Sequence, residues 1–166
     1  IKKDLKLALH YLNIAATKLN DSNALHTLAS IYCNGSFDEN NNFEIKQDIL
    51  KGINYYIQSA SLANINAKFE LAKLYINPIN YINVLVNNTT DSYGLTDEEV
   101  NKLSTTFSNK KDTGIKYLIE VADNGLIEAQ HYLGNCYLFN NLNLFDKPNG
   151  KLAEYYLLKA ANQHYF

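Results

Sequence analysis

Residues 128–137 read Glu-Ala-Gln-His-Tyr-Leu-Gly-Asn-Cys-Tyr, and the spacing within this stretch recurs along the chain. Leu, a small residue and Tyr follow the Ala at offsets of four, five and eight. Three segments share this spacing, and we call them the A segments: Ala24-Leu28-Ala29-Tyr32, Ala67-Leu71-Ala72-Tyr75 and Ala129-Leu133-Gly134-Tyr137. These offsets lie on one face of a helix and do not alternate as in a strand. Their recurrence predicts a helical repeat array.

A second pattern alternates with the A segments: a small residue, Tyr three positions later and Ala at the eighth. Its four copies, the B segments, are Ala8-Tyr11-Ala15-Ala16, Gly52-Tyr55-Ala60, Gly114-Tyr117-Ala122 and Ala153-Tyr156-Ala160-Ala161. The sequence therefore predicts helices in the order B-A-B-A-B-A-B, with Gly125 supplying a positive φ for a tight B-to-A turn. We interpret the small residues as allowing helix axes to approach to about 8 Å. The tyrosines then fill the adjoining space as packing groups, not as stacking platforms for bases or sugars.

Each A segment is followed, three residues after its Tyr, by a residue that can end a helix: Gly35, Pro78 or Asn140. Insertions follow the first two A segments. We expect the first, at about 36–46, to be a flexible loop because it contains Asn40, Asn41 and Asn42.

The second insertion, at about 77–112, is too long to be plain loop. Thr96 and Glu99 have the spacing of a capping box, and apolar residues follow at helical spacing, which predicts a short helix at about 97–107. The preceding residues, 76–86, are apolar and rich in β-branched types. They are either extended or a short helix packed on the array.

Composition argues against several functions. The net charge is −2, all basic residues are Lys, and the absence of Arg removes the side chain best suited to bidentate phosphate or guanine recognition. We therefore expect no nucleic-acid partner. No stretch approaches the roughly 20 apolar residues that span a bilayer, so we expect no direct membrane insertion of this segment.

Catalytic and metal sites are also disfavoured. His26 and Cys33 are seven residues apart, about 10 Å along a helix, which is too far for a thiolate–imidazole pair. His131 and Cys136 are five apart and point in different directions. No histidines have metal-ligand spacing, and no Gly-rich phosphate loop is present. We expect no enzyme activity and no cofactor. Cys33 and Cys136 lie about two repeats apart, so we expect two buried free thiols.

The order of the two patterns resembles the Sel1-like repeat, a relative of the tetratricopeptide repeat. The best copy is residues 128–137 followed by Ala153-Glu-Tyr-Tyr-Leu-Leu-Lys-Ala-Ala161. The resemblance implies an all-α, right-handed α-solenoid of stacked antiparallel helix pairs. It also implies a non-enzymatic scaffold whose concave face, lined by the A helices, binds a protein or peptide, or another domain of the same chain.

The positions left open by the packing signature are one before the Ala and two, six and nine after it. In the three A segments these are Asn23, His26, Ser30 and Cys33; Asn66, Phe69, Lys73 and Ile76; and Glu128, His131, Asn135 and Leu138. From them we predict the partner-binding residues His26, Ser30, Phe69, Lys73, His131 and Asn135. The alternative interpretation is that these are ordinary solvated helix positions.

A second function stays open at this point. The segment is then a structural spacer within a larger membrane-associated or organellar assembly, such as an endoplasmic-reticulum degradation adaptor, a chitin synthase activator or a mitochondrial factor. The sequence leaves the endoplasmic reticulum lumen, the mitochondrion and the cytoplasm as candidate compartments. We expect residues 1–166 to be a single repeat segment of a longer protein, because the terminal helices present apolar faces; the alternative is that these faces let the segment self-associate.

Overall fold

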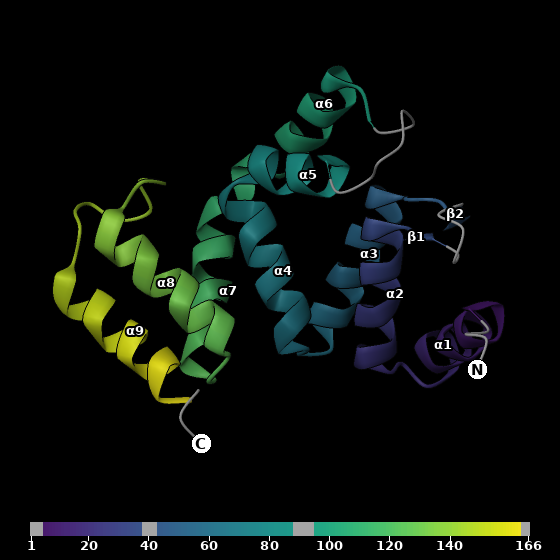
Figure 1. Cartoon of the computed structure of the whole chain (residues 1–166), viewed down its shortest axis with the longest axis horizontal. Helices are drawn as coiled ribbons and strands as arrows, with labels where there is room; N and C mark the ends of the chain where they lie inside the picture. Colours follow the sequence, from purple (N-terminus) through teal and green to yellow (C-terminus); the bar gives the residue numbers. More distant parts are fainter. Residues whose placement is uncertain (1–4, 38–42, 88–94, 164–166) are drawn as a thin grey trace.

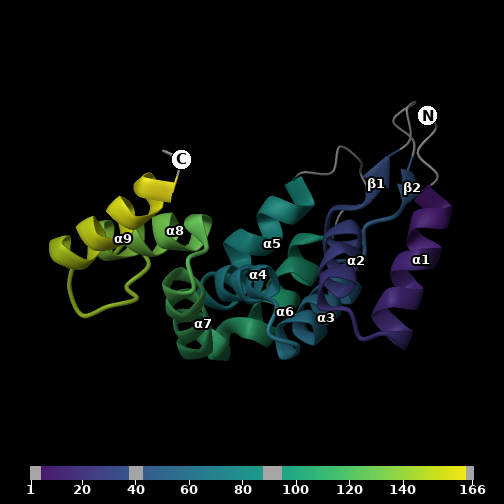
Figure 2. The same cartoon turned by 90° about the horizontal axis from the view of Figure 1, so that it is seen from below.

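The computed structural model describes residues 5–37, 43–87 and 95–163. Its elements follow the predicted order. The B helices are α1 (Leu5–Lys18), α3 (Ile49–Ser61), α7 (Lys111–Asp123) and α9 (Gly150–Gln163), and the A helices are α2 (Ser22–Asn34), α4 (Ile65–Ile76) and α8 (Ile127–Phe139). They form a row from α1 at one end to α9 at the other (Figure 1). Figure 2 shows α2, α4 and α8 toward one side of this row and α3 and α7 toward the other. The all-α solenoid is confirmed.

Small residues set the distance between each A helix and the following B helix. A Cβ placed on Gly52 of α3 would lie 2.8 Å from the carbonyl oxygen of Ala29 on α2. A Cβ on Gly114 of α7 would lie 2.9 Å from the Tyr75 Cβ on α4. Contacts this short are repulsive, so the backbones can approach only because these positions lack a side chain. The predicted role of the small residues is confirmed.

The signature tyrosines of paired A and B helices stack on one another in all three repeats. Ring centroids are 5.8 Å apart for Tyr32 and Tyr55, 6.4 Å for Tyr75 and Tyr117, and 5.9 Å for Tyr137 and Tyr156. Offset-stacked rings at these separations are favourable beyond their buried area. Each helix pair is thus fastened by a glycine or alanine crossing and one stacked tyrosine pair.

The turns from B to A helices each place one residue at positive φ: Asn20 at 50°, Ala63 at 63° and Gly125 at 94°. The N–H of Gly125 donates to the carbonyl of Ala122 at 3.1 Å, which closes the predicted reversal. Asn and Gly tolerate this conformation, whereas the Cβ of Ala63 costs about 1–2 kcal/mol there.

The predicted helix ends are confirmed. Helix α2 ends before Gly35, and α8 ends before Asn140, which adopts the left-handed conformation. Helix α4 ends at Ile76, and Pro78 then begins α5 (Pro78–Asn87), so the same residue also serves as a first helical position. The alternatives for 76–86 are resolved in favour of a helix.

The second insertion contributes α5 and α6 (Asp97–Phe107), which lie beyond one end of α4 (Figure 1). The capping box is present: the Glu99 N–H donates to the Thr96 hydroxyl, and the Thr96 N–H donates to the Glu99 carboxylate. A 3₁₀ turn, η1 (Ser108–Lys110), joins α6 to α7. Ile82 and Leu85 of α5 and Val100, Leu103 and Phe107 of α6 belong to the same core cluster as residues of α2, α3 and α4.

The first insertion differs from the expected loop, because it forms an antiparallel hairpin of β1 (Ser36–Phe37) and β2 (Phe43–Ile45). Phe and Ile favour strands, and this preference prevails at the two ends of the insertion. Asn40, Asn41 and Asn42 lie outside the described residues. The Gln47 side-chain amide donates to the carbonyls of Cys33 and Leu85, at 2.7 and 3.0 Å, and so ties both insertions to the end of α2.

Substituting Gly52→Ala tests the helix crossing. We expect a loss of about 2 kcal/mol in the free energy of unfolding, because the added methyl group meets backbone and the Cys33 side chain. Gly150→Ala is the matched control, since a Cβ there has no atom within 4 Å. Denaturant unfolding followed by circular dichroism measures both. Equal stability of the two variants would contradict the conclusion that close packing of α2 and α3 requires Gly at position 52.

Substituting Ala63→Gly tests the turn. Removing the Cβ at positive φ should stabilise the protein by about 1 kcal/mol. Ala161→Gly, at an exposed position within α9, should instead destabilise it by about 1 kcal/mol. Thermal unfolding of both variants distinguishes the two effects, and a lower melting temperature for Ala63→Gly would be the contrary result.

Candidate functional site

The A helices expose one face that the packing signature leaves open. We call the surface formed by offsets two, three and six of the three A helices the A face; its residues are His26, Thr27, Ser30, Phe69, Glu70, Lys73, His131, Tyr132 and Asn135. Each of these side chains is half-buried or exposed. All six predicted partner-binding residues lie on this face, so the structure leaves them accessible.

Between α2 and α4 the A face is polar. The His26 ring lies 5.5 Å from the ring of buried Tyr56, which also hydrogen-bonds to the Ser30 side chain. Glu70 accepts hydrogen bonds from the Lys73 ammonium group and the Tyr81 hydroxyl, both at 2.8 Å. Lys73 and Glu70 also form an ion pair, so this part of the A face carries little net charge.

Burial governs the electrostatics here. Desolvation lowers the pKa of His26 below its ordinary value, and the nearby Glu70 carboxylate opposes this shift only in part. His26 is therefore neutral at pH 7 and offers one donor and one acceptor nitrogen. Desolvation, with a smaller contribution from Glu70, also raises the pKa of Tyr81, which stays a hydrogen-bond donor.

Between α4 and α8 the A face is aromatic. The Phe69 and Tyr132 rings meet edge to face with centroids 6.2 Å apart. The Lys73 ammonium lies 4.8 Å from the centre of the Phe69 ring, and the side chains of His131 and Asn135 approach to 3.3 Å. Contacts thus join Lys73 and Phe69 on α4 to Tyr132 on α8, whereas His26 and Ser30 on α2 contact Tyr56 of α3.

Two positions expected to be open are buried. Cys33 and Ile76, at offset nine, pack against the B-helix crossing, where a Cβ on Gly52 would meet Cys33 and one on Gly114 would meet Ile76. Offset nine lies only about 40° around the helix from the packed small residue at offset five, which explains the error. Leu138, at the same offset on α8, is exposed.

Sequence reasoning missed the row at offset three, which contains Thr27, Glu70 and Tyr132. This row lies about 60° from offset six around the helix axis. A helical-wheel projection of the sequence would therefore have placed it on the open face. Tyr81 could not have been found in this way, because it reaches Glu70 from the inserted helix α5.

Both cysteines are free and buried, which agrees with the expectation of buried thiols and not with the open position that the offset pattern assigned to Cys33. Desolvation raises the pKa of Cys33 to about 12, with nearby Glu70 and Asp48 adding to the shift, and raises the pKa of Cys136 to about 11. Both are thiols at neutral pH, whereas a cysteine nucleophile needs the thiolate. In the part of the chain that the structure describes, no group of three or more His, Cys, Asp or Glu side chains could hold a metal ion.

The same described ranges contain no helix with both the length and the apolar character needed to span a membrane. Stacked antiparallel helix pairs with an accessible A-helix face define the class of α-solenoid repeat proteins. Residues 1–18, 22–64 and 127–165 match the Sel1 repeat family. The chain belongs to this family, whose members generally act in protein–protein interaction and are typically non-enzymatic.

Comparison with solved structures agrees on the fold. Twelve chains match, among them a Sel1 repeat protein from Oxalobacter formigenes with a TM-score of 0.59 and 18 % identity. The alignment covers 98 % of this chain and 92 % of that one. No curated protein matches. Residues 65–126 lie outside the family match, yet α4 and α7 within them have the same glycine crossing and stacked tyrosines.

Thiol reactivity checks the burial of the cysteines. At pH 8 we expect an aromatic disulfide reagent to modify Cys33 and Cys136 about 100-fold more slowly in the folded protein than in denaturant, because both are buried and protonated. A Ser61→Cys variant, at an exposed position, provides the reactive control. Fast modification of either native cysteine in the folded protein would be the opposite result.

Proposed function

We propose that this chain is a protein-interaction scaffold that binds a partner protein or peptide segment through the A face. The observation that supports this most is that α2, α4 and α8 each expose polar or aromatic side chains at the same offsets. Figure 2 shows these helices toward one side of the row, and the proposal places one bound segment along that side.

The chemistry of the A face favours an uncharged segment. Glu70 is already satisfied by Lys73 and Tyr81, and His26 is neutral at pH 7. Ser30 and Asn135 supply hydrogen-bonding groups that suit a peptide main chain, and Phe69 with Tyr132 provides an aromatic contact for an apolar side chain.

The buried thiols support the non-enzymatic side of the proposal, because neither Cys33 nor Cys136 is suited to act as a nucleophile. In the described part of the chain, the ring contacts of the two A-face His residues are with groups other than carboxylates. His131 contacts the amide of Asn135, and His26 contacts the Tyr56 ring.

A triple variant of the A face tests the proposal: His26→Ala, Lys73→Ala and His131→Ala, one change per A helix. Phe69 is left intact because it packs against Tyr132. The control carries Gln58→Ala, Lys116→Ala and Lys151→Ala, which are exposed positions on the three following B helices.

The measurement is affinity capture from an extract of the source cell, with circular dichroism confirming that both variants fold. We expect proteins retained by the wild type to be retained by the control and lost from the A-face variant, with a purified partner binding about tenfold more weakly or worse. Retention of the same proteins by both variants would contradict partner binding through the A face and would favour the structural-spacer function.

A further inference from the structure

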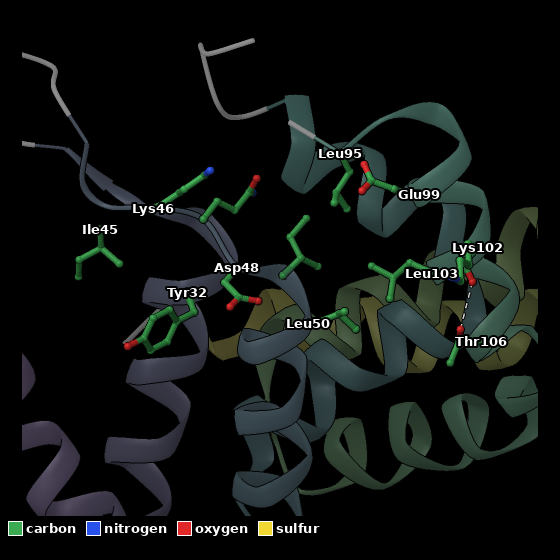
Figure 3. A pocket seen from close by; sticks show the side chains of 12 residues that line it. Tyr32, Ile45, Lys46, Asp48, Leu50, Leu95, Glu99, Lys102, Leu103 and Thr106 are labelled. Carbon is green, nitrogen blue, oxygen red and sulfur yellow. Dashed lines mark hydrogen bonds between the residues drawn. The ribbon is translucent and has the colours of Figure 1, made fainter. Parts of the chain in front are cut away.

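A cavity of about 670 Å³ lies between the two insertions, apart from the A face (Figure 3). The first insertion and the start of α3 provide one wall through residues 45–50. Leu95 and the residues of α6 provide the opposite wall, and Tyr32 at the end of α2 completes the lining. A volume of about 300–1,000 Å³ is usual for small-molecule sites.

The lining is apolar where the two walls face one another. Ile49 and Leu103 are buried, and Leu103 points toward the first wall in Figure 3. Leu50 also lines the cavity but is 57 % exposed, so an apolar ligand would cover a leucine that the fold leaves open to water. Removing such surface from water is favourable in proportion to its area.

The two carboxylates that line the cavity accept hydrogen bonds from the N-terminal ends of helices. Asp48 accepts the Lys51 N–H at 3.0 Å and caps α3, and Glu99 accepts the Thr96 N–H at 2.8 Å and caps α6. The hydrogen bonds from the Thr96 backbone and hydroxyl, with a smaller contribution from the charge of Lys102, lower the pKa of Glu99. The partial positive charges at the N-terminal ends of α3 and α6 also stabilise these two carboxylates.

The lysines of the lining bring positive charge to the same cavity. Lys46 lies on the first wall and Lys102 on the second. Within the described residues, the ion pairs are those of Lys68 with Glu120 and Lys73 with Glu70; Lys102 is outside these pairs, although its charge acts on the Glu99 carboxylate. Because Asp48 and Glu99 also accept the capping hydrogen bonds, the Lys102 ammonium is the group of the second wall that can donate to an anion.

We propose that this cavity binds an amphipathic organic anion, with its apolar body between Leu50 and Leu103 and its carboxylate or sulfonate group at Lys102. Three separate segments surround the space, which suits a compact molecule better than a continuous peptide. The site goes beyond the scaffold function and is independent of it, because it shares no residue with the A face.

The test uses 8-anilinonaphthalene-1-sulfonate, a fluorescent molecule with an apolar body and one anionic group. We expect saturable fluorescence enhancement with the intact chain. Decanoate should displace the probe at least tenfold more effectively than decan-1-ol, which has a similar apolar body and no charge.

Matched variants locate the probe. Leu50→Glu should weaken its binding tenfold or more, whereas Leu158→Glu, at a leucine of α9 that is 54 % exposed, should leave it unchanged. Lys102→Gln should weaken the probe and decanoate about tenfold but not decan-1-ol, and Lys151→Gln should change neither.

Absence of saturable enhancement would overturn the proposal, and so would equal effects of Leu50→Glu and Leu158→Glu. Equal displacement by decanoate and decan-1-ol, or an unchanged affinity in Lys102→Gln, would overturn the preference for an anion. The triple variant of the A face should bind the probe like the wild type, so the failure of one proposal is distinguishable from the failure of the other.

Discussion

The close crossing of each A helix over the following B helix is the contact on which the rest of the structure depends. It requires a small residue on both helices, and it brings one tyrosine from each into a stack. Once this contact is made, the circumference of the A helix is divided. Offsets zero, four, five and eight are packed, as is offset nine on α2 and α4, and offsets two, three and six stay accessible. Packing therefore determines, by elimination, the surface that we propose for partner binding.

Local signals predicted most of the fold because they act within a few residues. The capping box of Thr96 and Glu99, the positive φ of Gly125 and the left-handed Asn140 all depend on side chains reaching their own backbone. The hairpin at the first insertion was not predicted, since pairing of residues 36–37 with 43–45 depends on strand contacts across the Asn-rich stretch. Cys33 and Ile76 were wrongly predicted to be open, because offset nine lies only about 40° around the helix from the packed offset five.

Only part of the candidate site could be predicted from the sequence, because some of its contacts join distant segments. Its rows at offsets two and six follow from the repeat, and the structure leaves all six of those residues accessible. The Tyr81 hydrogen bond to Glu70 and the cavity between the insertions depend on contacts between distant segments, which no local pattern specifies. The insertions therefore add features to the array that the repeat signature cannot encode.

The Gln47 side chain has a consequence for cooperativity. In a simple array each repeat contacts its neighbours alone, and a terminal repeat can open while the others stay folded. Here the Gln47 amide bonds to Cys33 at the end of α2 and to the carbonyl of Leu85, which follows Gln47 by 38 residues. Moving Gln47 away from the end of α2 also breaks the hydrogen bond to Leu85 of α5. We therefore expect opening of the first repeat to be coupled to that of α5, which is not its sequence neighbour.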